Sequence, residues 1–441
     1  MPDFATSTDA AVQRQLDRLN LLSPGADILG LERITALLAR IGDPHLRLPP
    51  VLHVAGTNGK GSVCAYLRAA VEATGYRPHV YTSPHLVRFN ERIRIAGELI
   101  TDEALAPLLE EVLDAGGDIG GSFFEVTTAA AFLAFARTPA HCTIVEVGLG
   151  GRLDATNVIP RPSICGIAQL GIDHQSFLGG TAEEIAAEKA GIAKPGTLLV
   201  TMAYPDRIAR RVAQVAQAAG ATPVVEKESW RFSVADQALR YTDARGTLTS
   251  HLPALAGPHQ AANLALAIAM LRFNPVVRLA SEHVAAAWNA RWPARMQRLG
   301  PGPLLDLLPP GSALWLDGGH NEAAAEAVAA ALETAAAGRP VHLVLGMLSN
   351  KDAQGLLTPF ARMARSLHGV AIPGHEHHAP TLLAQIAQTI GIPHAAPATG
   401  VASALAAIAR ESGHGQPPVV LILGSLYLAG TVLEANGEVP D

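Results

Sequence analysis

The sequence has little charge, no long uncharged apolar run and few cysteines. Charged residues make up 16% of the 441 positions, and the formal net charge is −6, which argues against a nucleic-acid protein held by a general basic surface. No run of about 18 uncharged apolar residues predicts a membrane span, and no basic segment followed by an apolar core predicts a signal peptide. We therefore expect a cytoplasmic protein that binds neither nucleic acid nor membrane.

The three cysteines, Cys64, Cys142 and Cys165, form neither a disulfide framework nor a C-x-x-C pair. Their apolar surroundings predict reduced, buried thiols. Lysine is also rare, and arginine supplies most of the positive charge. A retained lysine is therefore a candidate for chemistry, because arginine is not a compact ammonium and does not readily lose its proton. Lysine occurs only at positions 60, 189, 194, 227 and 351.

Short apolar runs alternate with helical patterns along the first part of the chain. This alternation predicts an α/β domain with a mostly parallel sheet and helices on both faces. An alternating polar and apolar stretch at 230–252 predicts a small antiparallel appendage. The predicted strands are 51–55, 79–81, 143–147, 164–168 and 197–201, and the predicted helices are 62–74, 127–136 and 182–193.

A Gly- and Pro-rich segment at 300–311 predicts a linker. After it the α/β pattern restarts, with strands at 313–316, 341–346 and 419–423 and a helix at 322–337. We expect two domains, a first at 1–296 that contains the phosphate loop described next, and a smaller, Rossmann-like α/β domain at 297–441.

The segment V-L-H-V-A-G-T-N-G-K-G-S, at 51–62, places a glycine-rich loop between a buried strand and a helix. Its spacing differs from the Walker A pattern, because position 54 is Val54 and the hydroxyl comes one residue late, at Ser62. Gly56, Gly59 and Gly61 allow backbone N–H groups to converge on oxygens at the start of a helix, and Lys60 can reach terminal phosphates. The loop predicts a phosphate site, and an ordinary strand-to-helix turn is the alternative.

Polar residues follow two further strands. Glu146 stands at the carboxyl end of one strand and His174 follows the next, where open α/β sheets place ligand groups. Glu146 predicts a metal or cation ligand, unless it pairs structurally with Arg152. His174 is a candidate Mg²⁺ ligand, although imidazole is a softer ligand than those that magnesium usually binds. A hydrogen-bonded loop histidine is its alternative.

Three other features have weaker signals. A capping box from Thr181 to Glu184 predicts the start of a helix that contains Lys189. The pattern alone predicts that Lys189 lies on a solvated face of this helix. Asp317 ends a strand of the second domain, where an acidic residue commonly binds a ribose hydroxyl. His320 lies at the start of the following helix, a place suited to anions. The histidines at 375, 377 and 378 match no metal motif and are read as surface residues.

Together with this loop, an ordered set of segments between about residues 27 and 424 resembles the folylpolyglutamate synthase/dihydrofolate synthase family of the Mur ligase superfamily. The set comprises G-T-N-G-K-G-S (56–62), T-S-P-H-L (82–86), N-E-R-I-R-I (90–95), F-F-E-V-T-T-A-A-A-F (123–132), E-V-G-L-G-G-R-L-D-A-T-N (146–157), E-K-A-G-I (188–192), H-Q-A-A-N-L-A (259–265) and D-G-G-H-N (317–321).

The resemblance implies a role for each matching position. Lys60, His174 and a carbamylated Lys189 would be catalytic, in a chain that uses ATP and Mg²⁺, with a monovalent cation also allowed. ATP would contact Thr57, Asn58, Gly59, Lys60, Gly61, Ser62, Asn263, Arg295, Asp317 and His320; Mg²⁺ would be held by Ser62, Ser83, Glu146 and His174, directly or through water; and the pterin or pteroate group would contact Asp27, Ile28, Leu29, Ser122, Phe123, Phe124, Glu125, Leu153, Asp154 and Ala155.

The implied activity is ATP-dependent joining of L-glutamate to the carboxylate of dihydropteroate, of reduced folates, or of both, through an acyl phosphate. These small molecules would be its partners, and the chain would act as a monomer. The alternatives are a monofunctional folylpolyglutamate synthase, a cell-wall Mur-type amino-acid ligase, a P-loop NTPase that drives a partner's conformational change, and a scaffold with an inactive site.

Overall fold

The structure is a computed structural model that describes residues 5–22, 29–413 and 415–441. Its contacts group into two compact units, and each is described by itself. The first runs to residue 254 and adds 260–291, and the second takes 255–259 and 292–441. The contacts thus change unit between Arg291 and Trp292, shortly before the predicted 296/297 boundary, and they assign a short segment that ends at the first residue of α9 to the second unit.

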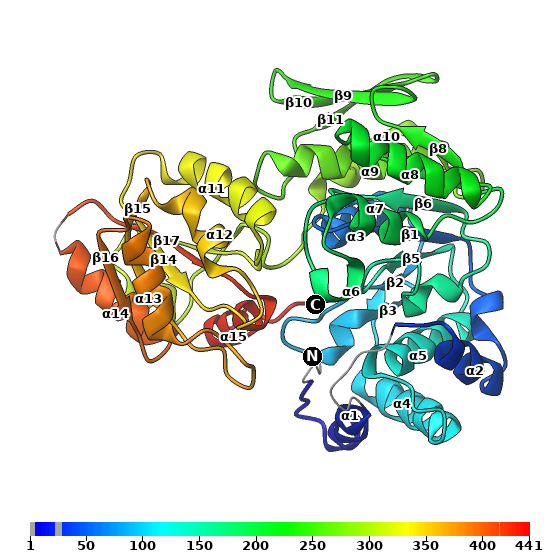
Figure 1. Cartoon of the computed structure of the whole chain (residues 1–441), viewed down its shortest axis with the longest axis horizontal. Helices are drawn as coiled ribbons and strands as arrows, with labels where there is room; N and C mark the ends of the chain where they lie inside the picture. Colours follow the sequence, from blue (N-terminus) through cyan, green and yellow to red (C-terminus); the bar gives the residue numbers. More distant parts are fainter. Residues whose placement is uncertain (1–4, 23–28, 414) are drawn as a thin grey trace. The chain divides into compact units, whose positions relative to one another are not determined.

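Within the described residues, the first unit is built on an eight-stranded sheet in the order β4-β3-β2-β5-β1-β6-β7-β8 (Figure 1). All neighbouring pairs from β2 to β8 are parallel, and β3 and β4 are antiparallel. The mostly parallel α/β sheet predicted from the sequence is confirmed. Its strands are β1 (Val51–Ala55), β2 (Pro78–Tyr81), β3 (Ile93–Ile95), β4 (Glu98–Leu99), β5 (Cys142–Glu146), β6 (Ile164–Ile167), β7 (Leu198–Thr201) and β8 (Thr222–Val225).

Two helices of the first unit begin at capping boxes. The Thr181–Glu184 capping box starts α7, as predicted, and a second box from Ser122 to Glu125 starts α5. The helix after the glycine loop begins at Lys60, two positions before the predicted 62. The first unit contains α1 (Ala10–Leu21), α2 (Glu32–Arg40), η1 (Pro44–Leu46), α3 (Lys60–Glu72), η2 (Phe89–Arg92), α4 (Asp102–Gly116), α5 (Phe123–Arg137), η3 (Ala155–Val158), α6 (Gln175–Leu178), α7 (Ala182–Ala190), α8 (Asp206–Ala218), α9 (His259–Phe273, from Gln260 onward), α10 (Ser281–Ala285) and η4 (Ala286–Asn289).

Two separate apolar clusters pack against this sheet. One joins α1, α2, α4 and α5 to side chains of β1, β2 and β5, and the other joins α7 and α8 to β6 and β7. Val145 of β5 belongs to the first cluster, and Val147, which lies just beyond the end of that strand, belongs to the second. The three cysteines are buried free thiols, which confirms the prediction from their apolar surroundings.

The stretch at 230–252 forms a three-stranded antiparallel sheet, as predicted. Trp230 stacks on Tyr241 across two strands, with ring centroids 5.8 Å apart. Asp243 forms a buried ion pair with Arg272 of α9 at 2.6 Å, so the appendage is tied to the helix that follows it. Its strands are β9 (Trp230–Ala235), β10 (Ala238–Asp243) and β11 (Gly246–His251).

The second unit holds a six-stranded sheet in the order β12-β13-β17-β14-β15-β16, parallel apart from β12. This is the smaller Rossmann-like domain that the sequence predicts. None of the helices in the described ranges is long and apolar enough to cross a bilayer. The elements are β12 (Gln297–Arg298), η5 (Leu305–Leu307), β13 (Ala313–Leu316), α11 (Glu322–Ala336), β14 (Val341–Leu345), α12 (Ala353–Leu357), η6 (Thr358–Phe360), β15 (Ala364–Gly369), α13 (Pro380–Thr389), β16 (His394–Pro397), α14 (Val401–Ser412), β17 (Val419–Leu423) and α15 (Leu426–Asn436).

His342 and His368 are buried in this sheet. The burial of His342 predicts that the protein loses stability in acid. His342 on β14 is 2% exposed, and its Nδ1 lies 2.8 Å from Ser366 Oγ. Burial lowers the pKa of His342 to about 4, with Arg365 and His368 adding to the shift and Glu411 opposing it. Because the folded state then binds fewer protons than the unfolded state, the contribution of His342 is present above a pH of about 6.5 and is lost as the pH falls toward 4.

We expect unfolding at pH 5 to cost about 2 kcal/mol less than at pH 7.5 on account of His342 alone. His342→Gln removes the titration and should flatten this part of the pH dependence, measured as the urea midpoint between pH 7.5 and 4.5. His394→Gln, on the exposed edge strand β16 of the same sheet, is the matched control. An unchanged pH slope in His342→Gln would refute the assignment.

Candidate active site

The predicted ligand groups follow four strands that are neighbours in the sheet. β2, β5, β1 and β6 are adjacent and parallel, so the segments after their carboxyl ends emerge at one edge. Ser83 follows β2, Glu146 ends β5, Lys60 follows β1 and His174 follows β6. Residues separated by more than 100 positions are therefore brought to the same edge of the first unit.

The glycine loop after β1 has the backbone that a close phosphate contact requires. Gly59 has φ +85° and immediately precedes α3, so the N-terminus of that helix opens onto the loop. Lys60 is the first residue of α3, and its ammonium donates to the carbonyls of Gly56, at 3.1 Å, and Thr57, at 3.3 Å. The ammonium of Lys60 is thus hydrogen-bonded to the backbone of the loop itself.

The loop is held by the segment after β6, through a residue that the sequence analysis did not single out. The carbonyl of Gln169 accepts the backbone N–H groups of Thr57, at 2.8 Å, and Asn58, at 3.2 Å, while its side chain accepts from Asn58 Nδ2 at 2.8 Å. Thr57 Oγ1 exchanges hydrogen bonds with Gly171, at 3.0 and 3.1 Å. The hydroxyl of Thr57 is therefore engaged in fixing the loop.

The start of α9 packs against the other side of the loop. An ideal Cβ placed on Gly59 would lie 2.5 Å from Asn263 Oδ1, so no side chain fits at Gly59. Deeper in α9, Gly166 of β6 has no room for a Cβ beside Met270, which seats the helix on the sheet. The structure thus places Asn263 against the loop, although the two are far apart in sequence.

Ser83 and Glu146 lie together at the ends of β2 and β5. Glu146 is 4% exposed, and its Oε2 lies 3.4 Å from the backbone nitrogen of Ser83. The alternative of a structural pair between Glu146 and Arg152 is wrong, because Arg152 forms its ion pair with Glu188 at 2.9 Å. A buried carboxylate beside a serine presents oxygen donors of the kind that magnesium prefers.

Lys189 is buried, so its interpretation as part of a solvated helix face is wrong. Its exposed fraction is 3%, and within the described ranges its ammonium makes no hydrogen bond or close ion pair. Burial, helped by the charge of Lys60, lowers the pKa of Lys189 to about 7, against the opposing charges of Asp173 and Asp154. The lowered pKa makes the uncharged, nucleophilic amine more accessible near neutral pH than in an ordinary lysine.

His174 lies at the same edge but differs from the other candidates. It has φ +52°, its side chain is 42% exposed, and its Nε2 lies 3.8 Å from Asp173 Oδ2. In the part of the chain that the structure describes, no three His, Cys, Asp or Glu side chains gather in a metal-binding arrangement. Magnesium does not require one, because it commonly keeps several waters and takes one or two carboxylates together with substrate phosphates. Ser83 and Glu146 fit that donor set.

Most of the residues predicted to contact a pterin group also have a structural role, in helix caps, hydrogen bonds or the core. Glu125 caps α5, accepting from Ser122 N, and forms an ion pair with Arg33 at 3.0 Å. Asp154 is buried, which raises its pKa, and accepts from Leu149 and Thr156. Those that remain partly exposed are Leu29, Ser122, Phe124 and Leu153; Phe123, Glu125, Asp154 and Ala155 are buried, and Asp27 and Ile28 lie outside the described residues.

In the second unit, Asp317 organises the turn before α11. Its carboxylate accepts the backbone N–H groups of Met296 and Gly319, both at 2.7 Å. His320 Nδ1 lies 3.1 Å from the carbonyl of Gly318, and Arg295 Nη1 donates to the carbonyl of Ala294 at 3.0 Å. Contacts of Arg295, Asp317 and His320 with a nucleotide stay a prediction.

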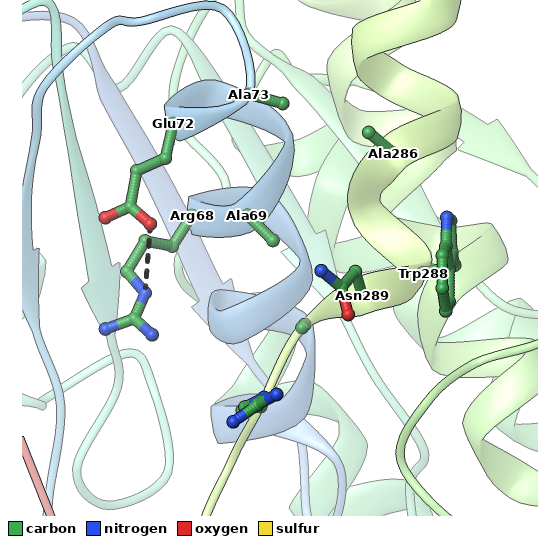
Figure 2. Close-up of a pocket in the computed structure, with 9 residues that line it drawn as sticks. Arg68, Ala69, Glu72, Ala73, Ala286, Trp288 and Asn289 are labelled. Carbon is green, nitrogen blue, oxygen red and sulfur yellow. Dashed lines mark ion pairs between the residues drawn. The ribbon is translucent and has the colours of Figure 1, made fainter.

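A pocket of about 540 Å³ lies on the first unit (Figure 2). It contains none of the predicted site residues. An ion pair between Arg68 and Glu72, at 3.8 Å, lies at its α3 wall. Its lining residues are Arg68, Ala69, Glu72, Ala73, Ala286, Trp288, Asn289, Ala290 and Arg291.

This chain is similar to known proteins in both sequence and fold. Residues 309–435 match the family described as dihydrofolate synthetase, C-terminal domain. The dihydrofolate synthase/folylpolyglutamate synthase of Escherichia coli is 35% identical over 77% of this chain and 76% of its own length. The dihydrofolate synthetase of Saccharomyces cerevisiae is 31% identical over 93% of this chain and 98% of its own length.

Two solved structures have the same fold over nearly the whole chain. E. coli FolC in complex with DHPP and ADP has a TM-score of 0.85 and 30% identity, over 97% of this chain and 98% of that one. A bifunctional folylpolyglutamate synthase/dihydrofolate synthase with Mn, AMPPNP and L-glutamate bound has a TM-score of 0.82 and 29% identity, over 98% and 99%. On its sequence, its fold and its strand-edge residues, the chain belongs to the dihydrofolate synthase/folylpolyglutamate synthase family.

Proposed function

We propose that this protein is an ATP-dependent ligase of folate biosynthesis that joins L-glutamate to the carboxylate of dihydropteroate and of reduced folates. The observation that carries the proposal is the arrangement at one sheet edge of a phosphate loop with Lys60 and a serine–carboxylate pair, together with a buried lysine that is sensitive to the charge of Lys60, in a chain of this family. It would act in the cytoplasm, as a monomer, on small-molecule substrates.

The chain's own groups would bind and orient the nucleotide. Loop N–H groups and the start of α3 suit the phosphates, and the ammonium of Lys60 is free to exchange its backbone carbonyl partners for phosphate oxygens. Ser83 and Glu146 would hold Mg²⁺, with Ser62 and His174 acting directly or through water. Mg²⁺ bound there would offset charge on the transferred phosphoryl group.

The reaction would proceed through an acyl phosphate. An oxygen of the substrate carboxylate attacks the γ-phosphorus of ATP, the bond to the β–γ bridging oxygen breaks, and ADP leaves. The uncharged amine of L-glutamate then attacks the activated carbonyl carbon, inorganic phosphate leaves with the acyl oxygen, and the amine loses a proton. Phosphorylation is needed because oxide is a very poor leaving group from a carboxylate. Lys60 would stabilise the charge that shifts between these oxygens.

Lys189 would act after reaction with carbon dioxide. Its uncharged amine can attack CO₂ and lose a proton, which gives a carbamate. This converts a cationic side chain into a carboxylate-like anion. The charge of the adjacent Lys60, which disfavours a second ammonium at this place, favours that anion. A carbamate there would support the metal and the γ-phosphate.

The proposed choice of acceptor substrates is based on the activities for which the relatives are named. The E. coli relative is named for both activities and the yeast relative for dihydrofolate synthetase alone. We propose both activities, with a monofunctional folylpolyglutamate synthase as the alternative.

The test is direct. Purified protein is incubated with Mg·ATP, L-glutamate and either dihydropteroate or tetrahydrofolate, and glutamylated products are detected by mass. We expect a product with each acceptor, dependent on ATP and absent with D-glutamate. ATP hydrolysis without a glutamylated product from either acceptor would overturn the proposal, and product from tetrahydrofolate alone would establish the monofunctional alternative.

A further inference from the structure

Gln260 connects the phosphate loop to α9 through a buried amide that the sequence analysis assigned no role. It is the second residue of α9 and 1% exposed. Its Nε2 donates to Ser62 Oγ at 3.3 Å, and its Oε1 accepts from Asn263 Nδ2 and from the hydroxyl of Tyr66, each at 3.2 Å. One side chain thus contacts two residues predicted to serve the nucleotide, from two different helices.

The polarity of these bonds determines how Asn263 is oriented. Gln260 Oε1 is an acceptor only, so Asn263 must present its Nδ2 there. The carbonyl oxygen of Asn263 is then turned to the glycine loop, where it lies 2.5 Å from the position of an ideal Gly59 Cβ. Reversal of the Asn263 amide would place two acceptors together, which is unfavourable in a buried position.

The same amide restricts the hydroxyl of Ser62. A serine in the first turn of a helix can otherwise turn its hydroxyl toward a nearby backbone carbonyl. When Gln260 donates to Ser62 Oγ it occupies one lone pair of that oxygen. The remaining lone pair and the hydroxyl proton are then directed away from the Gln260 amide.

We propose that Gln260 is a positioning residue, which orients the Ser62 hydroxyl and the Asn263 amide for a metal–nucleotide complex and touches neither metal nor nucleotide itself. The inference rests on the proposed function, since it assumes that Ser62 and Asn263 serve Mg·ATP. A glutamine suits this position, because its amide donates to Ser62 and accepts from Asn263 and Tyr66 at once.

Two variants separate the parts of this role. Gln260→Met keeps the approximate size and removes all three hydrogen bonds. Gln260→Glu keeps the acceptors for Asn263 and Tyr66 but cannot donate to Ser62 when ionised. Tyr66→Phe is the matched control, because it removes one hydrogen bond to the same amide and leaves those to Ser62 and Asn263 in place.

The readout is binding of AMPPNP by calorimetry, with Mg²⁺ and with EDTA, together with the melting temperature of the ligand-free protein. We expect Gln260→Met and Gln260→Glu to weaken Mg·AMPPNP binding about tenfold or more, with a smaller loss in EDTA. The KM for ATP should rise while that for L-glutamate stays unchanged, and Tyr66→Phe should bind as the wild type does.

Wild-type Mg·AMPPNP affinity in a folded Gln260→Met or Gln260→Glu protein would overturn the assignment. So would equal losses with Mg²⁺ and with EDTA accompanied by the same loss in Tyr66→Phe, which would mark a purely structural contact. Because the readout is nucleotide binding, failure of the protein to ligate glutamate would contradict the proposed function without deciding this one.

Discussion

Lys189→Ala is expected to lower the ligation rate about 10³-fold, because it removes the group proposed to carry the carbamate beside the phosphate loop. Short carboxylates such as formate or acetate should restore part of the activity, since they can occupy the space vacated by the buried side chain. Lys189→Arg should be equally inactive, because guanidinium does not lose its proton to react with CO₂. Rates are measured at saturating ATP and acceptor, with and without added carboxylate.

Lys194→Ala is the matched control for this prediction. Lys194 lies a few residues beyond α7 and donates to the carbonyl of Asn157 at 2.9 Å, without a predicted role in the chemistry. We expect its rate to stay within a few-fold of wild type when corrected for the folded fraction. Full activity in Lys189→Arg would refute the carbamate, and so would a Lys189→Ala protein that is active without added carboxylate.

Glu146→Gln is expected to lower the rate by a factor of about 10² to 10³ at ordinary Mg²⁺ concentrations. The substitution keeps the shape of the side chain and removes the anionic oxygen at the end of β5, so Mg²⁺ should bind more weakly beside Ser83. Much of the loss should be recovered at high Mg²⁺ or with Mn²⁺. The measurement is the rate as a function of metal concentration, at fixed ATP.

Glu188→Gln provides the control, because it removes a nearby carboxylate whose partner is Arg152. Its metal dependence should match that of the wild type. If Glu146→Gln showed the wild-type metal dependence at an unchanged rate, Glu146 would not be a metal ligand. A large loss that no metal concentration relieves would instead assign it a structural role.

Local patterns predicted most of the first sheet and the loop. Five consecutive buried residues at 51–55 form β1, and the glycines that follow form the turn into α3. These features depend on neighbours in sequence, so periodicity and turn chemistry are sufficient to identify them. The helix start was predicted two residues late, because Gly59 rather than the hydroxyl of Ser62 ends the loop, through a left-handed backbone.

The sequence carries a signal for the burial of Lys189. Lys189 lies four positions after Ile185, which places both on the same face of α7, and Ile185 is fully buried. The capping box and the many charged residues of this helix favoured an exposed position for Lys189. Helical spacing from an apolar neighbour would have favoured the buried face.

By itself, the sequence determined the central strands of both sheets, the phosphate loop, the order of the two domains and, through its motifs, the family. Only the tertiary structure decided which side chains meet. Gln169 and Gln260 hold the loop from positions 111 and 198 residues away from their partners Asn58 and Ser62, and Arg152 pairs with Glu188 rather than Glu146. Such contacts depend on strand order and helix packing, which no local pattern specifies. The lowered pKa of Lys189 likewise arises from burial and from Lys60, which strand order brings near.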